Sequence, residues 1–405
     1  MIQRPLYVER IRQTFSVHPV TALLGPRQCG KTTLARLLAS REPSTYFDLE
    51  DPLDRARLAN PVQALGALRG LVIIDELQRQ PALFEVLRVL ADRPRSRTRF
   101  LVLGSASPSL IKGVTETLAG RVGFVDMGGF TTGEVGISRL NRLWIRGGFP
   151  RSFLAPSERA SLGWRAGFIR TFLERDVPQL GIGVPAETLR RFWTMTAHYH
   201  GQVWNAAEFA RSLGSAEHTA RRYLDILAGA YMVRVVPPWF ENLGKRQVKA
   251  PKIYLRDSGV LHALLRIDTL HDLQAHPKLG ASWEGFALEQ LLACVEARDT
   301  YYWATHAGAE LDALVFRRSK RYGFEFKYTD APAATKSMHV ALGDLRLEHL
   351  WVVYPGTKSW AAAEHITVTP LRDLETVLNS LGSGGARPHR RAAGGAGPAA
   401  RRRMT

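Results

Sequence analysis

The apolar positions of the chain follow three patterns, and each pattern predicts a different kind of structure. In the first 150 residues, short and nearly continuous apolar runs alternate with segments of helical periodicity; the runs are at 20–24, 71–74 and 100–103. Such runs are typical of strands buried on both faces of a parallel sheet. Residues 156–229 carry apolar side chains at helical spacing, and residues 251–375 mix short strand patterns with helices. We therefore predict an α/β fold with a parallel-sheet domain at 1–150, a helical segment at 151–245 and a second α/β domain at 246–380.

A phosphate-binding loop follows the first apolar run. The run enters the sequence GPRQCGKT, and the helical pattern LARLLAS comes soon after it. This is the spacing GxxxxGK[ST] between a strand and a helix, where backbone N–H groups and the helix N-terminus hold phosphates. Lys31 is expected to reach the β- and γ-phosphates of ATP, and Thr32 to bind Mg²⁺. The predicted nucleotide-binding residues are Gly25, Pro26, Arg27, Gln28, Cys29, Gly30, Lys31, Thr32 and Thr33.

Four further side chains of the first domain are candidates for ATP hydrolysis. The run LVIIDE ends in Asp75 and Glu76, at the carboxyl end of a predicted parallel strand, where ligands of α/β sheets bind. Asp75 would hold Mg²⁺ through water, and Glu76 would orient or deprotonate the attacking water. Ser105 ends the run FLVLGS and is either a sensor of the γ-phosphate or part of a plain turn. Arg121 is either a finger for a neighbouring subunit's site or a surface cation at a helix end.

The middle segment contains a helix-turn-helix pattern. AAEFARSLG predicts a helix that stops at Gly214, SAEHTARRYLDILAG a second helix, and YMVRVV a strand. Helix, glycine-containing turn, helix and strand in this order are typical of a winged helix. If the module binds DNA, the side chains expected at the groove or its phosphates are His218, Thr219, Arg221 and Arg222. The alternative is a winged helix that packs against the ATPase as a lid and touches no nucleic acid.

Three charged residues of the C-terminal region have the spacing of a metal-dependent site. Asp312 leads one strand pattern, and Glu325 and Lys327 lie on the next. Residues i and i+2 of a strand share a face, so Glu325 and Lys327 point the same way. In this D…ExK arrangement two carboxylates hold Mg²⁺ and the lysine positions or activates the water that attacks a phosphate. Glu284, on the preceding helix, would add a third carboxylate; the alternative is an ordinary cross-strand charge pattern.

Together these motifs resemble the AAA+ superfamily, and within it a prokaryotic group of P-loop ATPases with a conserved C-terminal region. The resemblance covers roughly residues 5–375 and rests on GPRQCGKTTLARLL, VIIDELQRQPALFEVLRVLAD, FLVLGSASPSLI, ETLAGRV, IRGGFPRSF, LERDVPQLG and KAPKIYLRDSGVLHALL. It implies an ATPase of AAA+ type but no particular substrate. The C-terminal region is similar to the PD-(D/E)xK nuclease fold, with Leu311 in place of the motif's proline. Cys29 is a departure, because the group usually has a small apolar residue at that position.

Charge and composition add constraints on partners and compartment. The chain has 405 residues, with 55 Lys and Arg against 37 Asp and Glu, a formal net charge of +18. Six of the arginines lie in the Gly/Ala/Pro-rich tail 381–405, which we expect to be disordered; it is either a nucleic-acid-binding arm or a solvated tail. Two cysteines exclude a disulfide framework. The chain has no signal-peptide pattern and no run of about 18 apolar residues, so we predict a cytoplasmic protein with no membrane-spanning helix.

Three hypotheses for function follow. The first is a Mg²⁺-dependent AAA+-type ATPase whose nucleotide cycle drives the winged-helix and nuclease-like regions, acting on double-stranded DNA. The second is a slow nucleotide switch with a C-terminal scaffold for protein partners. The third is a metal-dependent DNA nuclease gated by ATP. A role for Arg121 in a neighbouring subunit's site would require an oligomer.

Overall fold

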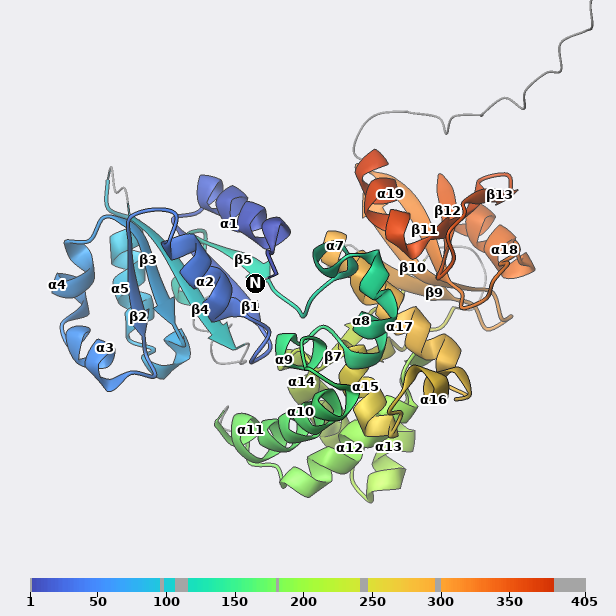
Figure 1. Ribbon diagram of the computed structural model, residues 1–405, viewed down its shortest axis with the longest axis horizontal. Helices are drawn as coiled ribbons and strands as arrows, with labels where there is room; N and C mark the ends of the chain where they lie inside the picture. The colour runs from blue at the N-terminus through green and yellow to red at the C-terminus, as the bar shows by residue number, and fades with distance from the viewer. Residues whose placement is uncertain are drawn as a thin grey trace, which may run out of the picture.

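The computed structural model describes residues 2–94, 98–105, 116–179, 182–240, 247–295 and 300–381 (Figure 1). These residues form an N-terminal parallel-sheet domain, a middle module of helices around a small sheet, and a C-terminal domain with a mixed sheet. The predicted α/β class, with a helical part between two sheet domains, is therefore confirmed. Apart from Leu381, the basic tail lies outside the described residues.

The N-terminal domain is a five-stranded parallel sheet in the order β2-β3-β4-β1-β5. Its strands are β1 (Val20–Gly25), β2 (Ser44–Asp48), β3 (Gly70–Asp75), β4 (Thr98–Ser105) and β5 (Val122–Asp126). Side chains of α1 (Pro5–Val17) and α2 (Lys31–Ala39) share one buried cluster with one face of the sheet, and those of α4 (Pro61–Gly66) and α5 (Leu83–Ala91) share a second cluster with the other. A further described helix, α3 (Pro52–Arg57), contacts β2. Because β4 lies between β1 and β3, the loops that follow β1 and β3 meet at the same edge of the sheet.

The middle module is built from helices and a three-stranded antiparallel sheet in the order β6-β8-β7. Two helices in this module, α13 (Ala206–Leu213) and α14 (Glu217–Gly229), are those predicted from the helix-turn-helix pattern, and Gly214 between them has the left-handed conformation that suits glycine. The preceding elements are α7 (Thr132–Val135), α8 (Leu140–Arg146), α9 (Pro150–Phe153), α10 (Glu158–Thr171), a π-helical turn at Phe172–Asp176, α11 (Val177–Gln179), α12 (Ala186–His198) and β6 (Gln202–Val203). The following ones are β7 (Val233–Val236), β8 (Lys252–Leu255), α15 (Ser258–Leu265) and α16 (Leu270–Gln274).

The C-terminal domain places a six-stranded mixed sheet, in the order β13-β14-β12-β11-β10-β9, against helices. Its elements are α17 (Leu279–Cys294), β9 (Thr300–Ala304), β10 (Glu310–Arg317), β11 (Lys320–Phe326), α18 (Lys336–Leu345), β12 (His349–Tyr354), β13 (Trp360–Ala363), β14 (Ile366–Pro370) and α19 (Leu374–Ser380). Strands β9, β10 and β11 are antiparallel, and β12 runs parallel to β11 after the crossover helix α18. The strand Lys252–Leu255, which the sequence pattern assigned to this domain, pairs instead with β7 and β6 of the middle module.

The connection between β7 and β8 joins the middle module to the C-terminal sheet. It runs along β9, where the Trp239 amide donates to the Tyr302 carbonyl at 2.7 Å, and the Val248 amide to the Ala304 carbonyl at 3.0 Å. The Trp239 ring also packs on Tyr301 and Phe316, at centroid distances of 5.0 and 4.6 Å. The described residues of this connection, 237–240 and 247–251, thus cover part of the edge of the C-terminal sheet.

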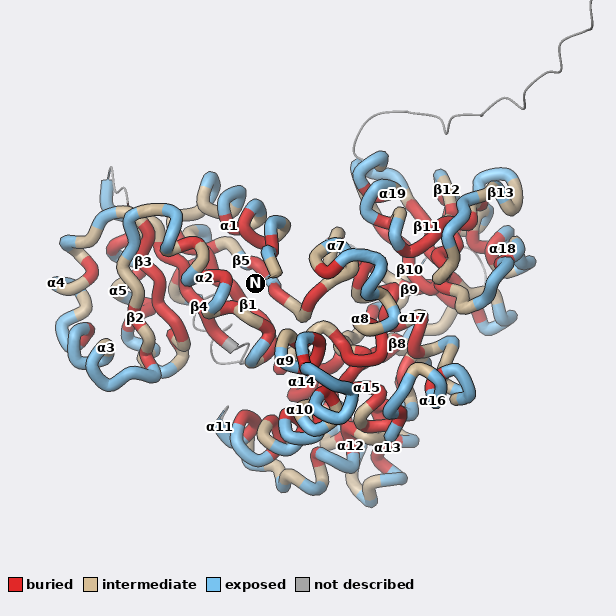
Figure 2. The backbone as a smooth tube through the Cα atoms, viewed as in Figure 1, coloured by how far each residue is buried: buried red, intermediate tan, exposed pale blue. Residues whose placement is uncertain are grey.

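One buried apolar cluster continues through all three parts. It extends from α1 and α2 through the middle helices to β11 and α19, and Figure 2 shows buried segments meeting at the centre of the molecule. The parts are therefore packed on one another rather than strung on linkers. In the portion of the chain that the structure describes, no helix combines the length and apolar character needed to cross a membrane.

Candidate functional site

The loop after β1 has the geometry of a phosphate-binding loop. Gly25 ends β1, and a Cβ there would lie 2.1 Å from the Met127 carbonyl oxygen, so a side chain is excluded. Gly30 has a φ of 102°, which also requires glycine, and α2 begins at the next residue. The Lys31 ammonium is buried and donates to the carbonyl oxygens of Gly25 at 2.9 Å and Pro26 at 2.8 Å. The loop thus curls around the lysine at the N-terminus of a helix.

Asp75 connects this loop to the end of the neighbouring strand β3. Its Oδ2 accepts a hydrogen bond from the Thr32 hydroxyl at 2.7 Å and another from the Tyr46 hydroxyl at 2.6 Å. A hydroxyl and a carboxylate held together in this way are the ligands that Mg²⁺ prefers when it binds with a triphosphate. The residues therefore fit a nucleotide-bound Mg²⁺ ion. Sequence reasoning missed Tyr46, which lies on the edge strand β2 one residue before the buried Phe47.

Glu76 lies beside Asp75 in a left-handed backbone conformation, with a φ of 55°. Burial raises the pKa of its carboxyl, the Lys31 ammonium counteracts this shift, and the Asp75 carboxylate adds to it. The Gln78 amide donates to its Oε2. A partly buried carboxylate with a raised pKa, next to the phosphate loop, is suited to accept a proton from water.

The other residues predicted for the N-terminal site differ in their position and exposure. Ser105 ends β4 and pairs in register with Gly25, but its side chain lies outside the described residues. Cys29 is buried, with its Sγ 3.6 Å from the Met127 carbonyl oxygen, whereas Gln28 and Thr33 are exposed. Arg121 precedes β5, at the sheet edge opposite the loop, and pairs with Asp92 at 2.6 Å. Within its own chain Arg121 is therefore remote from Lys31, and its proposed action on a neighbouring subunit stays a prediction.

Arg27 points out of the loop toward the middle module. Its Nη1 is 2.7 Å from Oδ1 of Asp176, the last residue of the π-helical turn. The same oxygen is 3.2 Å from Nε of Arg175. The phosphate loop and the middle module thus meet at one buried carboxylate.

The C-terminal domain brings the predicted carboxylates and lysine together. Lys327 Nζ lies 2.8 Å from Glu325 Oε2 and 3.9 Å from Asp312 Oδ2, although these residues come from two strands. Asp312 also accepts a hydrogen bond from the Phe326 amide at 3.0 Å. Burial and the neighbouring Asp312 raise the pKa of Glu325 well above its usual range. Burial alone would raise the pKa of Asp312 too, but the ammonium groups of Lys252 and Lys327 outweigh it and hold that pKa below its ordinary value.

Lys252, Tyr254 and Glu310 also belong to this cluster, and the sequence reasoning missed them. The ammonium of Lys252 is buried and lies 3.4 Å from Glu284 Oε1 and 3.5 Å from Asp312 Oδ1, and it also pairs with Glu310. The Tyr254 hydroxyl donates to Glu284 at 2.6 Å. Lys252 and Tyr254 stand two residues apart on β8, a strand of the middle module, so the cluster is shared between two parts of the chain. The sequence signal for this was the strand segment KIYL, in which Lys252 and Tyr254 are two residues apart and therefore share one face.

The carboxylates of this cluster offer a divalent cation two ligands rather than three. In the described ranges, no three His, Cys, Asp or Glu side chains are grouped so as to hold a metal ion. Glu284 is engaged by Tyr254 and Lys252, whereas Asp312 and Glu325 share Lys327, and Asp312 also lies 3.5 Å from Lys252. Two facing carboxyls repel one another when both are ionised, and Mg²⁺ is often bound through only one or two carboxylates and water. Asp312 and Glu325 fit such an ion.

The chain is similar to several known proteins. Residues 17–136 match a family described as AAA domain, residues 137–271 one described as Domain of unknown function (DUF8612), and residues 279–374 one described as Domain of unknown function (DUF4143). The proteins named Uncharacterized protein Rv2008c of Mycobacterium tuberculosis and Uncharacterized protein Mb2031c of Mycobacterium bovis are each 52% identical over 376 residues, which is 93% of this chain and 85% of theirs. The chain belongs to the family of these two mycobacterial proteins.

A solved structure entitled the Walker-type ATPase PABY2304 of Pyrococcus abyssi is 16% identical and aligns with 65% of this chain and 96% of its own, with a TM-score of 0.47. The family match over residues 17–136, together with the phosphate-loop motif and the strand order of the sheet, shows that this part of the chain is an AAA-type P-loop ATPase domain. The matched ranges place Lys252 in a different family segment from Asp312 and Glu325. The carboxylate cluster thus spans two segments that match different family models.

In this family member the predicted DNA-contacting helix is α14. His218, Arg221 and Arg222 are exposed on it, and Thr219 is half-buried. Arg221 lies 3.7 Å from Glu217 and over the Trp204 ring, with 5.6 Å from its guanidinium carbon to the ring centroid. The described residues of the β7–β8 connection, in contrast, form hydrogen bonds with β9. The exposed side chains of α14 are therefore available to a partner.

Tyr46 provides a test of the Asp75 site. Replacing it in Tyr46→Phe removes one hydrogen bond to the carboxylate and leaves Asp75 less firmly oriented, at a cost of about 1 kcal/mol. We expect the Mg²⁺ concentration that half-saturates nucleotide turnover to rise about 5-fold, which is that energy expressed as a ratio.

The matched control is Tyr199→Phe, which removes a tyrosine hydrogen bond to Glu208 in the middle module. Titrating Mg²⁺ at saturating ATP measures both variants. An unchanged Mg²⁺ requirement in Tyr46→Phe would show that Asp75 does not depend on this hydroxyl.

Proposed function

We propose that the chain is a Mg²⁺-dependent ATPase whose nucleotide cycle moves the middle module and the C-terminal domain. The observation that supports hydrolysis best is the group formed by Thr32, Asp75 and Glu76 beside Lys31. Lys31 would leave its loop carbonyls for the terminal phosphates, and Thr32 and Asp75 would hold Mg²⁺, with Ser105 at the adjacent strand end. Bound Mg²⁺ supplies charge neutralisation at the β- and γ-phosphates.

Glu76 is the proposed general base. It would accept a proton from the water that attacks the γ-phosphate. Because burial raises its pKa, Glu76 remains protonated up to a higher pH than an exposed glutamate. As the pH is lowered, the rate of hydrolysis should therefore decrease at pH values above the range in which glutamate ordinarily titrates. Its hydrogen bond from the Gln78 amide fixes the carboxylate in place.

A polar path supports coupling between the ATPase domain and the other parts. Asp126, at the end of β5, accepts a hydrogen bond from the Tyr231 hydroxyl of the middle module. The Arg256 guanidinium carbon stands 4.7 Å from the centroid of the Tyr231 ring, and Arg234 donates to both oxygens of Glu289 on α17, at 2.7 and 3.1 Å. These side chains line a cavity of about 1080 Å³ between the three parts. A shift of β5 would therefore be transmitted to α17 through these ion pairs, because separating a buried ion pair leaves a charge without compensation and costs free energy.

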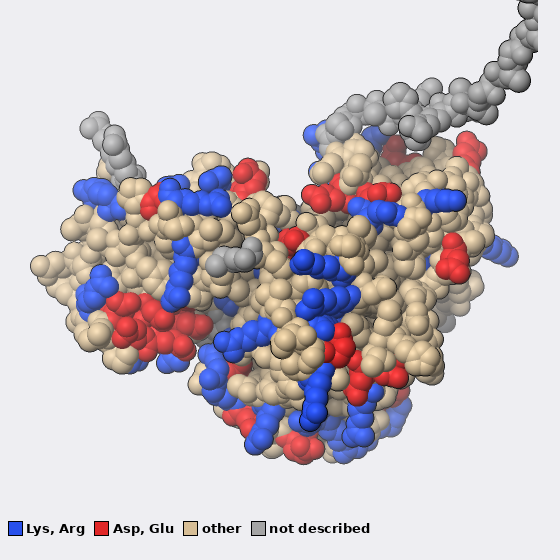
Figure 3. All heavy atoms as spheres, in the orientation of Figure 1, with Lys and Arg blue, Asp and Glu red and all other residues tan. Residues whose placement is uncertain are grey.

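The distribution of charge supports DNA as the substrate. Residues 137–271 contain 20 Lys and Arg against ten Asp and Glu, a net charge of +10, whereas residues 279–374 contain 10 against 12. The excess of positive charge outside the C-terminal tail is therefore concentrated in the middle module instead of being spread over the chain. Figure 3 shows Lys and Arg gathered over this module, and a patch of Asp and Glu on the ATPase domain. A basic surface next to an exposed recognition-type helix favours phosphate contacts.

The C-terminal cluster favours a second candidate function, a metal-dependent nuclease acting in the same protein. The order α17, β9, β10, β11, α18, β12 carries Glu284, Asp312, Glu325 and Lys327 into one cluster, as the resemblance to PD-(D/E)xK nucleases implies. Asp312 and Glu325 would hold Mg²⁺, and Lys327 would position or activate the attacking water. Lys252 would balance the charge of the remaining carboxylates. The competing function, a scaffold for protein partners, needs the same fold but no cleavage.

The ATPase proposal predicts a separation between nucleotide binding and hydrolysis. Lys31→Ala should lower both, because the ammonium contacts the phosphates. Glu76→Gln should keep ATP affinity within about 3-fold and reduce kcat by about 10²- to 10⁴-fold, the usual contribution of a general base. Phosphate release and fluorescent-nucleotide binding measure the two effects. Lys320→Ala, at an exposed lysine paired with Glu348, is the control and should behave as wild type; equal hydrolysis by wild type and Lys31→Ala would refute the site.

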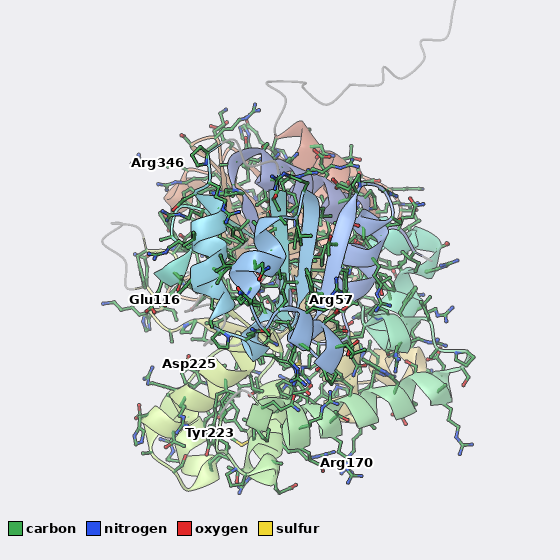
Figure 4. All side chains as sticks on the ribbon, turned by 90° about the vertical axis from the view of Figure 1, so that its left-hand side faces the viewer. Arg57, Glu116, Arg170, Tyr223, Asp225 and Arg346 are labelled. Atoms are coloured by element: carbon green, nitrogen blue, oxygen red, sulfur yellow. The ribbon has the colours of Figure 1, made fainter. Side chains whose placement is uncertain are left out.

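The DNA proposal predicts that double-stranded DNA stimulates the ATPase. Stimulation should fall steeply with salt, because phosphate contacts release counterions. Arg221→Ala/Arg222→Ala should lower it several-fold, whereas Arg346→Ala should not. Figure 4 shows Arg346 on the C-terminal domain, far from Tyr223 and Asp225 of α14. Absence of DNA binding even at low salt would favour the protein scaffold.

The nuclease proposal predicts one divalent-cation site that requires the Glu325 carboxylate. Titration of the nucleotide-free protein with Mn²⁺ should detect one such binding site. Glu325→Gln should abolish both this binding and the Mn²⁺-dependent cleavage of DNA. Glu348→Gln, at an exposed glutamate, should retain both. Binding of Mn²⁺ without cleavage in the wild type, or equal cleavage by wild type and Glu325→Gln, would remove the catalytic assignment.

A further inference from the structure

The π-helical turn Phe172–Asp176 brings the middle module against the phosphate loop. Its backbone contains one residue more than an α-helical turn would, an arrangement that occurs frequently at functional sites. Phe172 and Leu173 are buried, and the Phe172 ring packs on Trp193 at a centroid distance of 5.0 Å. Glu174 and Arg175 face outward, and Asp176 is buried. The aromatic contact therefore anchors the buried side of the turn, while Glu174 and Arg175 point to its outer side.

Asp176 joins two arginines from different parts of the chain. Its Oδ1 is 2.7 Å from Nη1 of Arg27 and 3.2 Å from Nε of Arg175, and its side chain is only 7% exposed. One carboxylate thus balances two guanidinium groups, which leaves a local excess of positive charge beside the phosphate loop. A second contact lies nearby, because a Cβ added at Gly30 would lie 3.8 Å from Pro150 of α9.

The two arginines are held to different degrees. Arg27 is largely buried and belongs to the loop itself, so its pairing with Asp176 fixes the distance between the loop and the turn. Arg175 is 56% exposed, and its pairing is with the residue next to it in sequence. The pair between adjacent residues contributes little to stability in contact with water, so Arg175 is free to change partner. A terminal phosphate carries more negative charge than one carboxylate and would compete for it.

Arg121 is in the opposite situation. It lies at the far edge of the sheet and pairs with Asp92, on the ATPase domain itself. Within one chain, therefore, Arg175 is next to the loop that would hold the triphosphate, and Arg121 is not.

We propose that Arg175 is the arginine that contacts the terminal phosphate of ATP within the same chain, and that the Arg27–Asp176 pair positions it. This inference rests on the proposed ATPase activity. When ATP binds, the Arg175 guanidinium leaves Asp176 for the γ-phosphate and stabilises the charge that develops there, while Arg27 keeps Asp176 and holds the module in place. Because ADP lacks that phosphate, Arg175 returns to Asp176 after hydrolysis and release of inorganic phosphate. The middle module thus distinguishes ATP from ADP.

The test compares Arg175→Ala with a matched variant at another exposed arginine. Arg175→Ala should lower kcat by about 10³-fold, the lower range for an arginine that completes a phosphoryl-transfer site. Its affinity for a non-hydrolysable ATP analogue should fall about 10-fold, whereas its affinity for ADP should stay within about 2-fold of wild type. Arg175→Lys should recover part of the loss. Arg170→Ala removes an exposed arginine of α10 that pairs with Glu174 and is labelled in Figure 4, and it should leave all three values unchanged.

The positioning pair is tested by Asp176→Asn and by Arg27→Ala. Each should lower kcat with little change in ADP affinity, and combining them should add little, because both remove the same contact. A thermal melting temperature close to that of wild type separates this effect from misfolding. If Asp176→Asn fails to fold, the comparison of Arg175→Ala with Arg170→Ala still decides, because both residues are exposed.

Each outcome has a definite meaning. Hydrolysis by wild type that Arg175→Ala does not alter would overturn this inference and leave the ATPase standing. Hydrolysis that Lys31→Ala does not alter, or no hydrolysis at all, would overturn the ATPase proposal instead.

Discussion

The hydrogen bond from the Thr32 hydroxyl to the Asp75 carboxylate joins the start of α2 to the end of β3, and the rest of the site is arranged around it. It exists because the sheet is parallel and β4 separates β1 from β3, so that the two loops meet at one edge. The position of Lys31, the raised pKa of Glu76 and the contact of Tyr46 all follow from this edge. A parallel sheet of buried apolar strands thus supplies a rigid base for a polar site.

Beyond this site, buried charges connect the parts of the chain. Asp176 receives Arg27 from the phosphate loop, Glu289 receives Arg234 and Arg256, and Lys252 reaches three carboxylates of the C-terminal domain. A buried ion pair contributes little net stability compared with apolar packing, but removing one partner leaves a charge without compensation. Such pairs therefore make separation of the parts costly and couple their movements. A nucleotide-dependent change at Asp176 would act on a structure already linked in this way.

The connection between β7 and β8 illustrates how packing joins the parts of the chain. Its described residues contact β9, which would otherwise be an exposed sheet edge. It also brings β8 to the C-terminal domain, so that Lys252 enters the carboxylate cluster. The exposed side chains of α14 leave the DNA alternative and the lid alternative of the sequence analysis open as predictions.

The sequence by itself determined the local features: the phosphate loop, the strand that ends in Asp75 and Glu76, the two helices around Gly214, and the strand alternation that sets Glu325 beside Lys327. Each depends on residues a few positions apart, where helix and strand periodicity fix the geometry. The tertiary structure decided which side chains meet across long separations, such as Arg27 with Asp176, 149 residues later. It also assigned β8 to the middle module and placed Arg121 away from Lys31. These features of the tertiary structure depend on the order of the strands and on the free-energy cost of removing charges from water at contacts between domains. The periodicity of apolar residues in the sequence encodes neither.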